Sequence, residues 1–132
     1  SGASDDGLDG SGGLSFMCKD MTFTQCGYSG VFARNTKGRL INCVITQCER
    51  SGIWCGTNTL IELEGSQTKV DGNVTSGSVY HYGLKTFNTS STIHLLFPLT
   101  KESVSTNNHN GQNFGTHNIG SIIETVNALE RL

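Results

Sequence analysis

The chain has 132 residues, enough for one domain with a sizeable core, and its formal net charge is −2. Only 15% of its residues are charged and no stretch clusters lysine and arginine, so nothing favours a nucleic-acid partner. No run of 18 apolar residues is present, and no membrane partner is expected. Helical periodicity is missing from every long stretch, whereas short runs such as Met21–Thr24 alternate in polarity. The expected fold class is therefore all-β.

The first thirteen residues, 1–13, are rich in glycine, serine and aspartate. This composition predicts a flexible linker or arm ahead of a domain over 14–132. Asp5, Asp6 and Asp9 lack the spacing of an EF-hand calcium loop. The basic segment and apolar run of a secretory signal peptide are not present in these residues. The sequence therefore does not assign the protein to a cellular compartment.

A nine-residue segment recurs: Thr24–Phe32 returns as Thr46–Trp54, with five identical positions at an offset of 22 residues. A fixed period of this length is typical of a solenoid, in which each repeat forms one coil stacked on the next. The third coil is aligned through Val74–Gly77 and Tyr82–Lys85. A second ladder is predicted from Leu60–Leu63, Thr92–Leu95 and Ser121–Glu124.

These repeats predict about four to five coils, followed by a short C-terminal cap over Thr125–Leu132 that has some helical character. Alternation along the strands assigns faces to the repeated residues. The side chains expected to point inward are Phe23, Ile45 and Val74 in one column and Val31, Ile53 and Leu84 in another. Those expected to point outward are Thr24, Thr46 and Thr75, and then Phe32, Trp54 and Lys85.

Five cysteines occur in the first half of the chain, at 18, 26, 43, 48 and 55. In the 22-residue register most of them lie over apolar residues, which indicates small buried hydrophobic side chains. Two alternatives stay open: a zinc site, and a disulfide between Cys26 and Cys48. Buried free thiols fit a reducing compartment better, whereas the sequons at Asn73 and Asn88 would matter only in a secreted protein.

One pattern recurs along the chain. It begins with alternating apolar residues and a Cys or Asn, and a Gly-Val or Gly-Ile follows several residues later. It is carried by Met21–Val31 and Cys43–Ile53, and less completely by Val70–Leu84. It resembles the right-handed parallel β-helix repeat of the pectin-lyase-like family, over about Leu14 to Gly115. The resemblance implies a short right-handed parallel β-helix. The family contains polysaccharide lyases, hydrolases and epimerases, viral tailspikes and non-enzymatic recognition domains.

The enzymes of that family use clustered carboxylates, often with calcium, and this chain has only Asp20 and Asp71 as aspartates beyond the linker. Glu62 and Glu64 share one face of a predicted strand, where a pair of carboxylates would suit a cation or acid–base chemistry. The competing interpretation is the exposed half of an alternating strand. The Gly-His-Gly and Asp-Pro-His-Asp motifs of the polygalacturonase-like enzymes and alginate epimerases are absent, and no cofactor is expected.

The strongest candidate for a binding surface is the outward pair Phe32 and Trp54, with Arg34 and Lys85 beside it. Such a surface suits a sugar or a protein partner, unless the N-terminal arm or loops of the chain cover it. A second candidate is the Tyr80-His81-Tyr82 run in a lengthened corner, which would contact a sugar or pack on the coil below.

The hypothesis is a non-catalytic recognition or structural module that binds carbohydrate, or an assembly unit of a surface or viral fibre, forming homo-oligomers. The alternative is a fragment of a polysaccharide-active lyase or epimerase.

Overall fold

The computed structural model describes residues 4–117 and 120–131, and the fold is all-β. The strands form three parallel sheets. Sheet A contains β1 (Leu8–Asp9), β4 (Val31–Ala33), β7 (Ile53–Cys55), β10 (Leu84–Phe87) and β13 (Phe114–His117). Sheet B contains β2 (Phe16–Lys19), β5 (Lys37–Ile41), β8 (Thr59–Glu64), β11 (Ser91–Leu96) and β14 (Ile122–Val126). Sheet C contains β3 (Thr22–Thr24), β6 (Val44–Thr46), β9 (Lys69–Asp71) and β12 (Ser105–Thr106).

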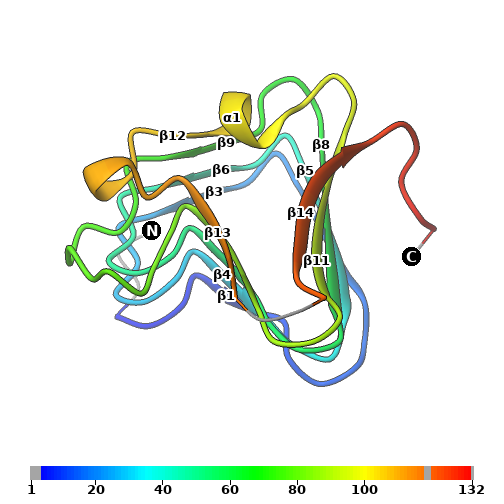
Figure 1. The fold of residues 1–132 in the computed structure, drawn as a ribbon, viewed down its shortest axis with the longest axis horizontal. Coiled ribbons are helices and arrows are strands. Elements are labelled where there is room, and N and C mark those ends of the chain that lie inside the picture. Colours follow the sequence, from blue (N-terminus) through cyan, green and yellow to red (C-terminus); the bar gives the residue numbers. More distant parts are fainter. Residues whose placement is uncertain (1–3, 118–119, 132) are drawn as a thin grey trace.

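The chain visits sheets A, B and C in turn and then returns to sheet A, so each strand pairs with the strand one circuit later. Figure 1 shows the three sheets as the sides of a triangle, with a short helix α1 (Lys101–Val104) beside sheet C. A 3₁₀ turn, η1 (His109–Gly111), follows β12. This arrangement is compatible with the predicted solenoid.

The register of the 22-residue repeat is confirmed in sheet A. Val31 pairs with Ile53 and Phe32 with Trp54, and Leu84 then pairs with Ile53 from the other side. Because successive residues of a strand point to opposite faces, this register places one apolar column inside and one ring column outside.

The core fills the space between the three sheets with stacked aliphatic side chains and cysteines. Its most buried large members come from strands of all three sheets, and they include Leu40, Ile45, Ile53, Ile61, Leu63, Leu84, Ile93, Leu95 and Val70. All five cysteines are free thiols and four are buried, as expected of small apolar side chains. Burial raises the pKa of the Cys55 thiol to about 12 and also raises the pKa of Cys48, which lies beside Cys26.

A buried polar column lies at the corner between sheets C and A, two residues after the end of each strand of sheet C. Cys26 and Cys48 occupy it in the first two circuits, and Asn73 and Asn108 in the next two. The Asn73 side chain accepts from the Cys48 backbone N–H and donates to the Ile45 carbonyl, both at 3.0 Å. Asn108 in turn accepts from the Asn73 N–H at 2.8 Å. The Cys48 and Asn73 N–H groups lie beyond the ends of β6 and β9, and these amides give them the partners that the sheet ladders do not.

Two predicted alignments differ from the structure. Ile45 pairs with Val70 and not with Val74, so Asp71 takes the place predicted for Thr75 in the outward column. The reason is that both corners of the third circuit are lengthened: residues 65–68 join β8 to β9, and residues 72–83 join β9 to β10. In sheet B, Thr92 pairs with Ile122, one residue later than the predicted ladder.

The two ends of the chain also differ from their predictions. Leu8–Asp9, inside the predicted linker, is strand β1, because its backbone continues the ladder of sheet A beyond β4. At the other end the predicted helical cap is absent from the described residues. Thr125 and Val126 complete β14, and residues 127–131 then cross the outer face of sheet B, where Glu130 contacts Arg39 and Glu62. Within the described residues, no helix has the length and apolarity needed to span a membrane.

Candidate functional site: an aromatic ladder on sheet A

Four rings form a continuous stack on the outer face of sheet A. Phe32 and Trp54 are nearly parallel, with ring centroids 4.3 Å apart and an interplanar angle of 5°. Trp54 stacks on Phe87 at 5.6 Å, and Phe87 on His117 at 4.9 Å. We call these four residues the aromatic ladder. Ring pairs at these separations attract one another beyond the area they bury, so the ladder also stabilises the sheet.

The ladder changes column between its second and third rings. Phe32 and Trp54 are register partners, but the partner of Trp54 on β10 is Lys85, and Phe87 lies two residues further along. The indole crosses this gap because Gly56 leaves room: a Cβ there would lie 2.5 Å from the Trp54 ring. Gly115 plays the same part for Tyr82, whose ring occupies the space where a Cβ would be 2.7 Å away.

The stacking decides which parts of the rings a ligand can reach. Because each ring covers the face of the next, the internal ring faces are occupied and the ring edges point outward. Phe32, Trp54 and Phe87 are accordingly half-buried, whereas His117 is exposed. The outward aromatic pair expected as a binding surface is therefore part of a column of rings seen edge-on from the solvent.

Cations surround the ladder. The Arg34 guanidinium lies 5.8 Å from the Phe32 ring centroid, and the Lys85 ammonium lies 5.7 Å from that of Phe87. Arg50 lies flat over Tyr28 at 3.9 Å. Among the described residues, the ion pairs involve only Lys37, Arg39, Glu62 and Glu130 of sheet B and the segment after it, so none of these three cations has a carboxylate within ion-pair distance. Asp6 nevertheless lies close enough to Arg50 for the two charges to interact. The charge of Arg34 and Lys85 is available to an anionic ligand.

The lengthened corner 72–83 lies beside the ladder and is held in place by side chains of the neighbouring circuits. Ser51 Oγ and His81 Nδ1 form a hydrogen bond of 3.1 Å, and the Tyr82 N–H donates to the same oxygen at 3.2 Å. The Gln112 amide donates to the His81 carbonyl at 2.7 Å, and Lys85 donates to the carbonyl of Tyr80. The interpretation of His81 as part of a loop packed on the neighbouring coil therefore agrees with its contacts, while Tyr80 is 74% exposed.

Two hollows flank the ladder. One has a volume of about 280 Å³ and is lined by Tyr80, Tyr82, Lys85, Phe87 and His117, together with Val79, Gly115 and Thr116. The other, of about 250 Å³, is lined by Asp6, Tyr28, Ser29, Phe32, Arg50, Trp54 and His81. All seven residues predicted for the site, from Phe32 to Lys85, thus lie on or beside one face of the molecule. Each hollow combines ring edges with one cationic side chain.

The state of His81 gives a testable pH dependence. Burial, and then the charges of Lys85 and Arg50, lower the pKa of His81 from 6.5 to about 4. Below about pH 6.5 the unfolded chain takes up a proton that the folded chain refuses until about pH 4, so the folded state loses stability across this window as the pH falls. We expect His81→Gln to remove about 1 kcal/mol of that loss, because the ring is only half-buried and partly screened by solvent. Urea denaturation of both proteins at pH 7.5, 5.5 and 4 measures this loss of stability. If the free energy of unfolding fell by the same amount between pH 7.5 and pH 4 in both proteins, the lowered pKa of His81 would be contradicted.

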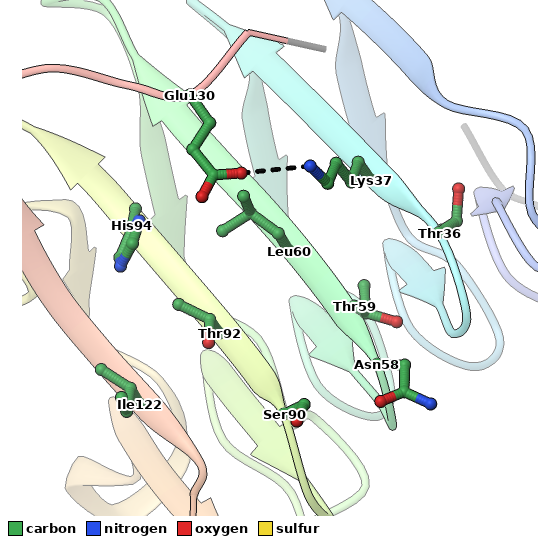
Figure 2. A pocket seen from close by; sticks show the side chains of 10 residues that line it. All are labelled: Thr36, Lys37, Asn58, Thr59, Leu60, Ser90, Thr92, His94, Ile122 and Glu130. Atoms are coloured by element: carbon green, nitrogen blue, oxygen red, sulfur yellow. Dashed lines mark hydrogen bonds and ion pairs between the residues drawn. The ribbon is translucent and has the colours of Figure 1, made fainter.

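A larger hollow, of about 540 Å³, lies elsewhere, on the outer face of sheet B (Figure 2). Its floor contains Leu60, Thr92 and Ile122 from three neighbouring strands, and Lys37 and Glu130 face each other at one side. Glu62, predicted as an exposed carboxylate, is fully buried on this face because the segment 127–131 covers it. Glu64 lies two residues along the same strand but is not part of this contact.

Three members of the sheet A face were not predicted: Phe87, His117 and Arg50. Phe87 could have been predicted from the sequence, because it lies two residues after Lys85 on the same strand and therefore points to the same face. Among the described residues, no three His, Cys, Asp or Glu side chains are placed to hold a metal ion. No family model matches the chain, and no curated protein or solved structure matches it either.

Proposed function

We propose that this protein is a non-catalytic recognition module built on a short right-handed parallel β-helix, and that its aromatic ladder binds an acidic glycan. The observation that carries the proposal is the combination of four ring edges with two cations, Arg34 and Lys85, that form no ion pair among the described residues. Sugars present C–H groups that contact aromatic side chains, and carboxylates or sulfates pair with arginine and lysine.

The shape of the face supports a charged ligand over a neutral one. A neutral sugar gains most from lying flat on an open ring face, and the ladder occupies its own internal faces. The ligand therefore reaches only ring edges and the two hollows, which are each large enough for about one sugar ring. Lys85 in one hollow and Arg50 in the other supply the charge that orients it. Burial lowers the pKa of the Lys85 ammonium, and an anionic partner would restore the stability of its charged form.

Trp54→Ala tests the proposal. We expect at least a tenfold loss of affinity for any acidic oligosaccharide that a glycan array identifies, because the indole is the central ring of the ladder and lines one hollow. Phe97→Ala is the matched control, since Phe97 is an aromatic residue that is 65% exposed outside this face. Titration calorimetry of both variants measures the effect.

Lys85→Gln separates charge from packing, because it keeps the rings and removes one cation. We expect it to weaken binding of the acidic glycan and to leave binding of its neutral analogue unchanged. Absence of glycan binding, together with a stable oligomer in sedimentation, would instead favour the assembly unit of a surface or fibre protein.

The second candidate is a polysaccharide-active enzyme, and one observation favours it. The 250 Å³ hollow brings together Asp6, Arg50 and His81. Burial raises the pKa of Asp6 and lowers that of His81, so one carboxyl and one neutral imidazole share a hollow with a guanidinium. A lyase requires a base of this kind and a cation against the substrate carboxylate. Ultraviolet absorbance from unsaturated products of a uronic-acid polymer, lost in His81→Gln, would favour this candidate over the recognition module.

A further inference from the structure

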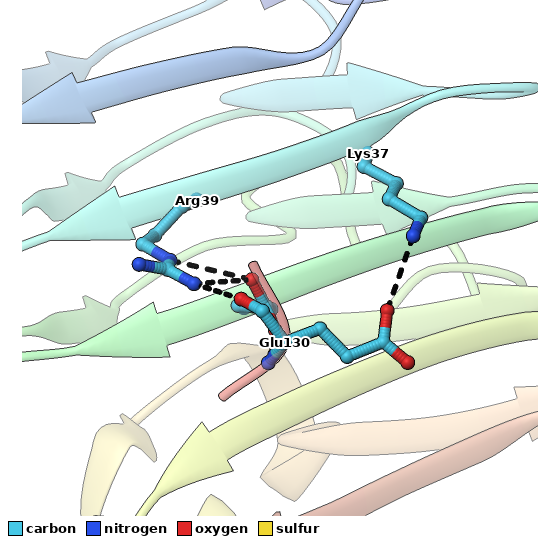
Figure 3. A network of polar contacts seen from close by, with 4 residues as sticks. Lys37, Arg39 and Glu130 are labelled. Carbon is cyan, nitrogen blue, oxygen red and sulfur yellow. Dashed lines mark hydrogen bonds and ion pairs between the residues drawn. The ribbon is translucent and has the colours of Figure 1, made fainter. Parts of the chain in front are cut away.

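The segment 127–131, which we call the strap, leaves β14 and lies across the outer face of sheet B. It has no helix or strand, and its main contacts come from one residue, Glu130. The backbone N–H of Glu130 donates to Glu62 Oε2 at 2.5 Å, and its carbonyl accepts from the Arg39 guanidinium. Its side chain pairs with Lys37 at 3.2 Å (Figure 3).

The groups that hold Glu130 are also held by each other. Arg39 and Glu62 are register partners on β5 and β8, and they pair with each other at 3.0 Å and 3.3 Å. One free edge of the carboxylate faces the strap N–H, and the guanidinium faces the strap carbonyl. This is recognition of a peptide backbone by a rigid donor and a rigid acceptor, with Lys37 added as a reader of an acidic side chain.

The strap uses this face incompletely. The Lys37–Glu130 pair is about half exposed on both sides, so it contributes little to holding the strap. The 540 Å³ hollow begins beside the Glu130 carboxylate, and its apolar floor of Leu60 and Ile122 is left uncovered. A segment held by a few polar contacts over an unfilled hollow opens at a small free-energy cost.

We propose that the outer face of sheet B is a docking site for an extended peptide segment of a partner protein that carries an acidic residue, and that the strap occupies this site in the free chain. The partner's acidic residue takes the position of Glu130: its N–H binds Glu62, its carbonyl binds Arg39 and its carboxylate binds Lys37. Its neighbouring side chains reach the hollow that the strap leaves empty. The site is separate from the aromatic ladder, which lies on sheet A.

Glu130→Pro in the full chain tests the site, because proline has neither the N–H nor the carboxylate and so frees the strap without altering Arg39, Glu62 or Lys37. The probe is a fluorescein-labelled peptide with the sequence of residues 125–132, measured by fluorescence anisotropy. We expect the probe to bind the Glu130→Pro chain at least tenfold more tightly than the wild type, in which the strap competes. Arg131→Ala, a substitution in the strap beside Glu130, is the control and should bind like the wild type.

Two further arms identify the contacts. A probe with lysine at the position of Glu130 should bind the Glu130→Pro chain about threefold more weakly, because repulsion replaces the half-exposed pair with Lys37. The double variant Arg39→Ala/Glu130→Pro should bind the original probe at least tenfold more weakly. If the proline variant folds poorly, the wild-type chain is titrated with the original probe and the lysine probe instead, and the same preference for the original probe is expected. Equal binding to the wild type and the strap variant, no binding to the strap variant, or binding that ignores the lysine probe and Arg39→Ala would each overturn the proposal.

Discussion

Glu62→Ala is expected to lower the free energy of unfolding by about 3 kcal/mol, one of the two largest effects that we predict for a single polar side chain. The carboxylate is fully buried and accepts hydrogen bonds from Arg39 and from the Glu130 N–H. Removing it leaves a guanidinium that is only 19% exposed without a counter-charge. Urea denaturation at pH 7.5 measures the change.

Lys37→Ala is the matched control for this prediction. Lys37 belongs to the other ion pair of the same face, and in that pair the side chains of Lys37 and Glu130 are both about half exposed. Its loss should cost less than about 1 kcal/mol. If Glu62→Ala cost no more than Lys37→Ala, the buried pair would not contribute to the stability of sheet B in the way its burial implies.

Asn73→Ala should lower the free energy of unfolding by a similar amount, about 3 kcal/mol, for a different reason. Asn73 is 1% exposed, and its amide satisfies the Cys48 N–H and the Ile45 carbonyl at the corner between sheets C and A. Alanine would leave the buried Cys48 N–H without its partner and remove the bond that the amide gives to the Ile45 carbonyl. Thermal and urea unfolding of the purified variant measure the loss.

Asn107→Gly provides the comparison within the same corner, because glycine accepts the left-handed backbone of this position (φ 54°) and removes only the side chain. Asn107 is exposed, and its amide donates only to Asp71, at 3.1 Å. We expect a loss of about 0.5 kcal/mol. Equal losses for the two asparagines would show that the buried column does not hold the corner together.

The repeat in the sequence was sufficient to predict the class of the fold and the register of sheet A. Identical residues 22 positions apart, such as Cys26 and Cys48, occupy equivalent places because parallel strands stack like residue over like residue. The register was wrong where the corners change length. Val74 resembles Ile45 in character, but a lengthened corner moves the strand to Val70, and an apolar pattern with a period of two cannot reveal a shift of four.

The candidate site could be predicted only in part, because the sequence shows which face a side chain takes but not how it leans. Trp54 was placed outward with Phe32, and that is where it lies. Its contact with Phe87 depends on the empty space above Gly56, which no pattern of polarity indicates. Glu62 was placed outward for the same reason, and its burial depends on a segment 68 residues later in the chain. Contacts of that kind depend on tertiary packing and leave no local signal.

The lean of the Trp54 side chain sets the direction in which a long ligand would run. Between Trp54 and Phe87 the backbone positions shift by two residues, which is about 7 Å along the strands, yet the ring centroids are only 5.6 Å apart. The indole therefore takes up most of the shift, and the four rings form a nearly continuous column that rises about 14 Å over three strand spacings. A polymer that touches all four rings must run across the strands, along the stacking direction.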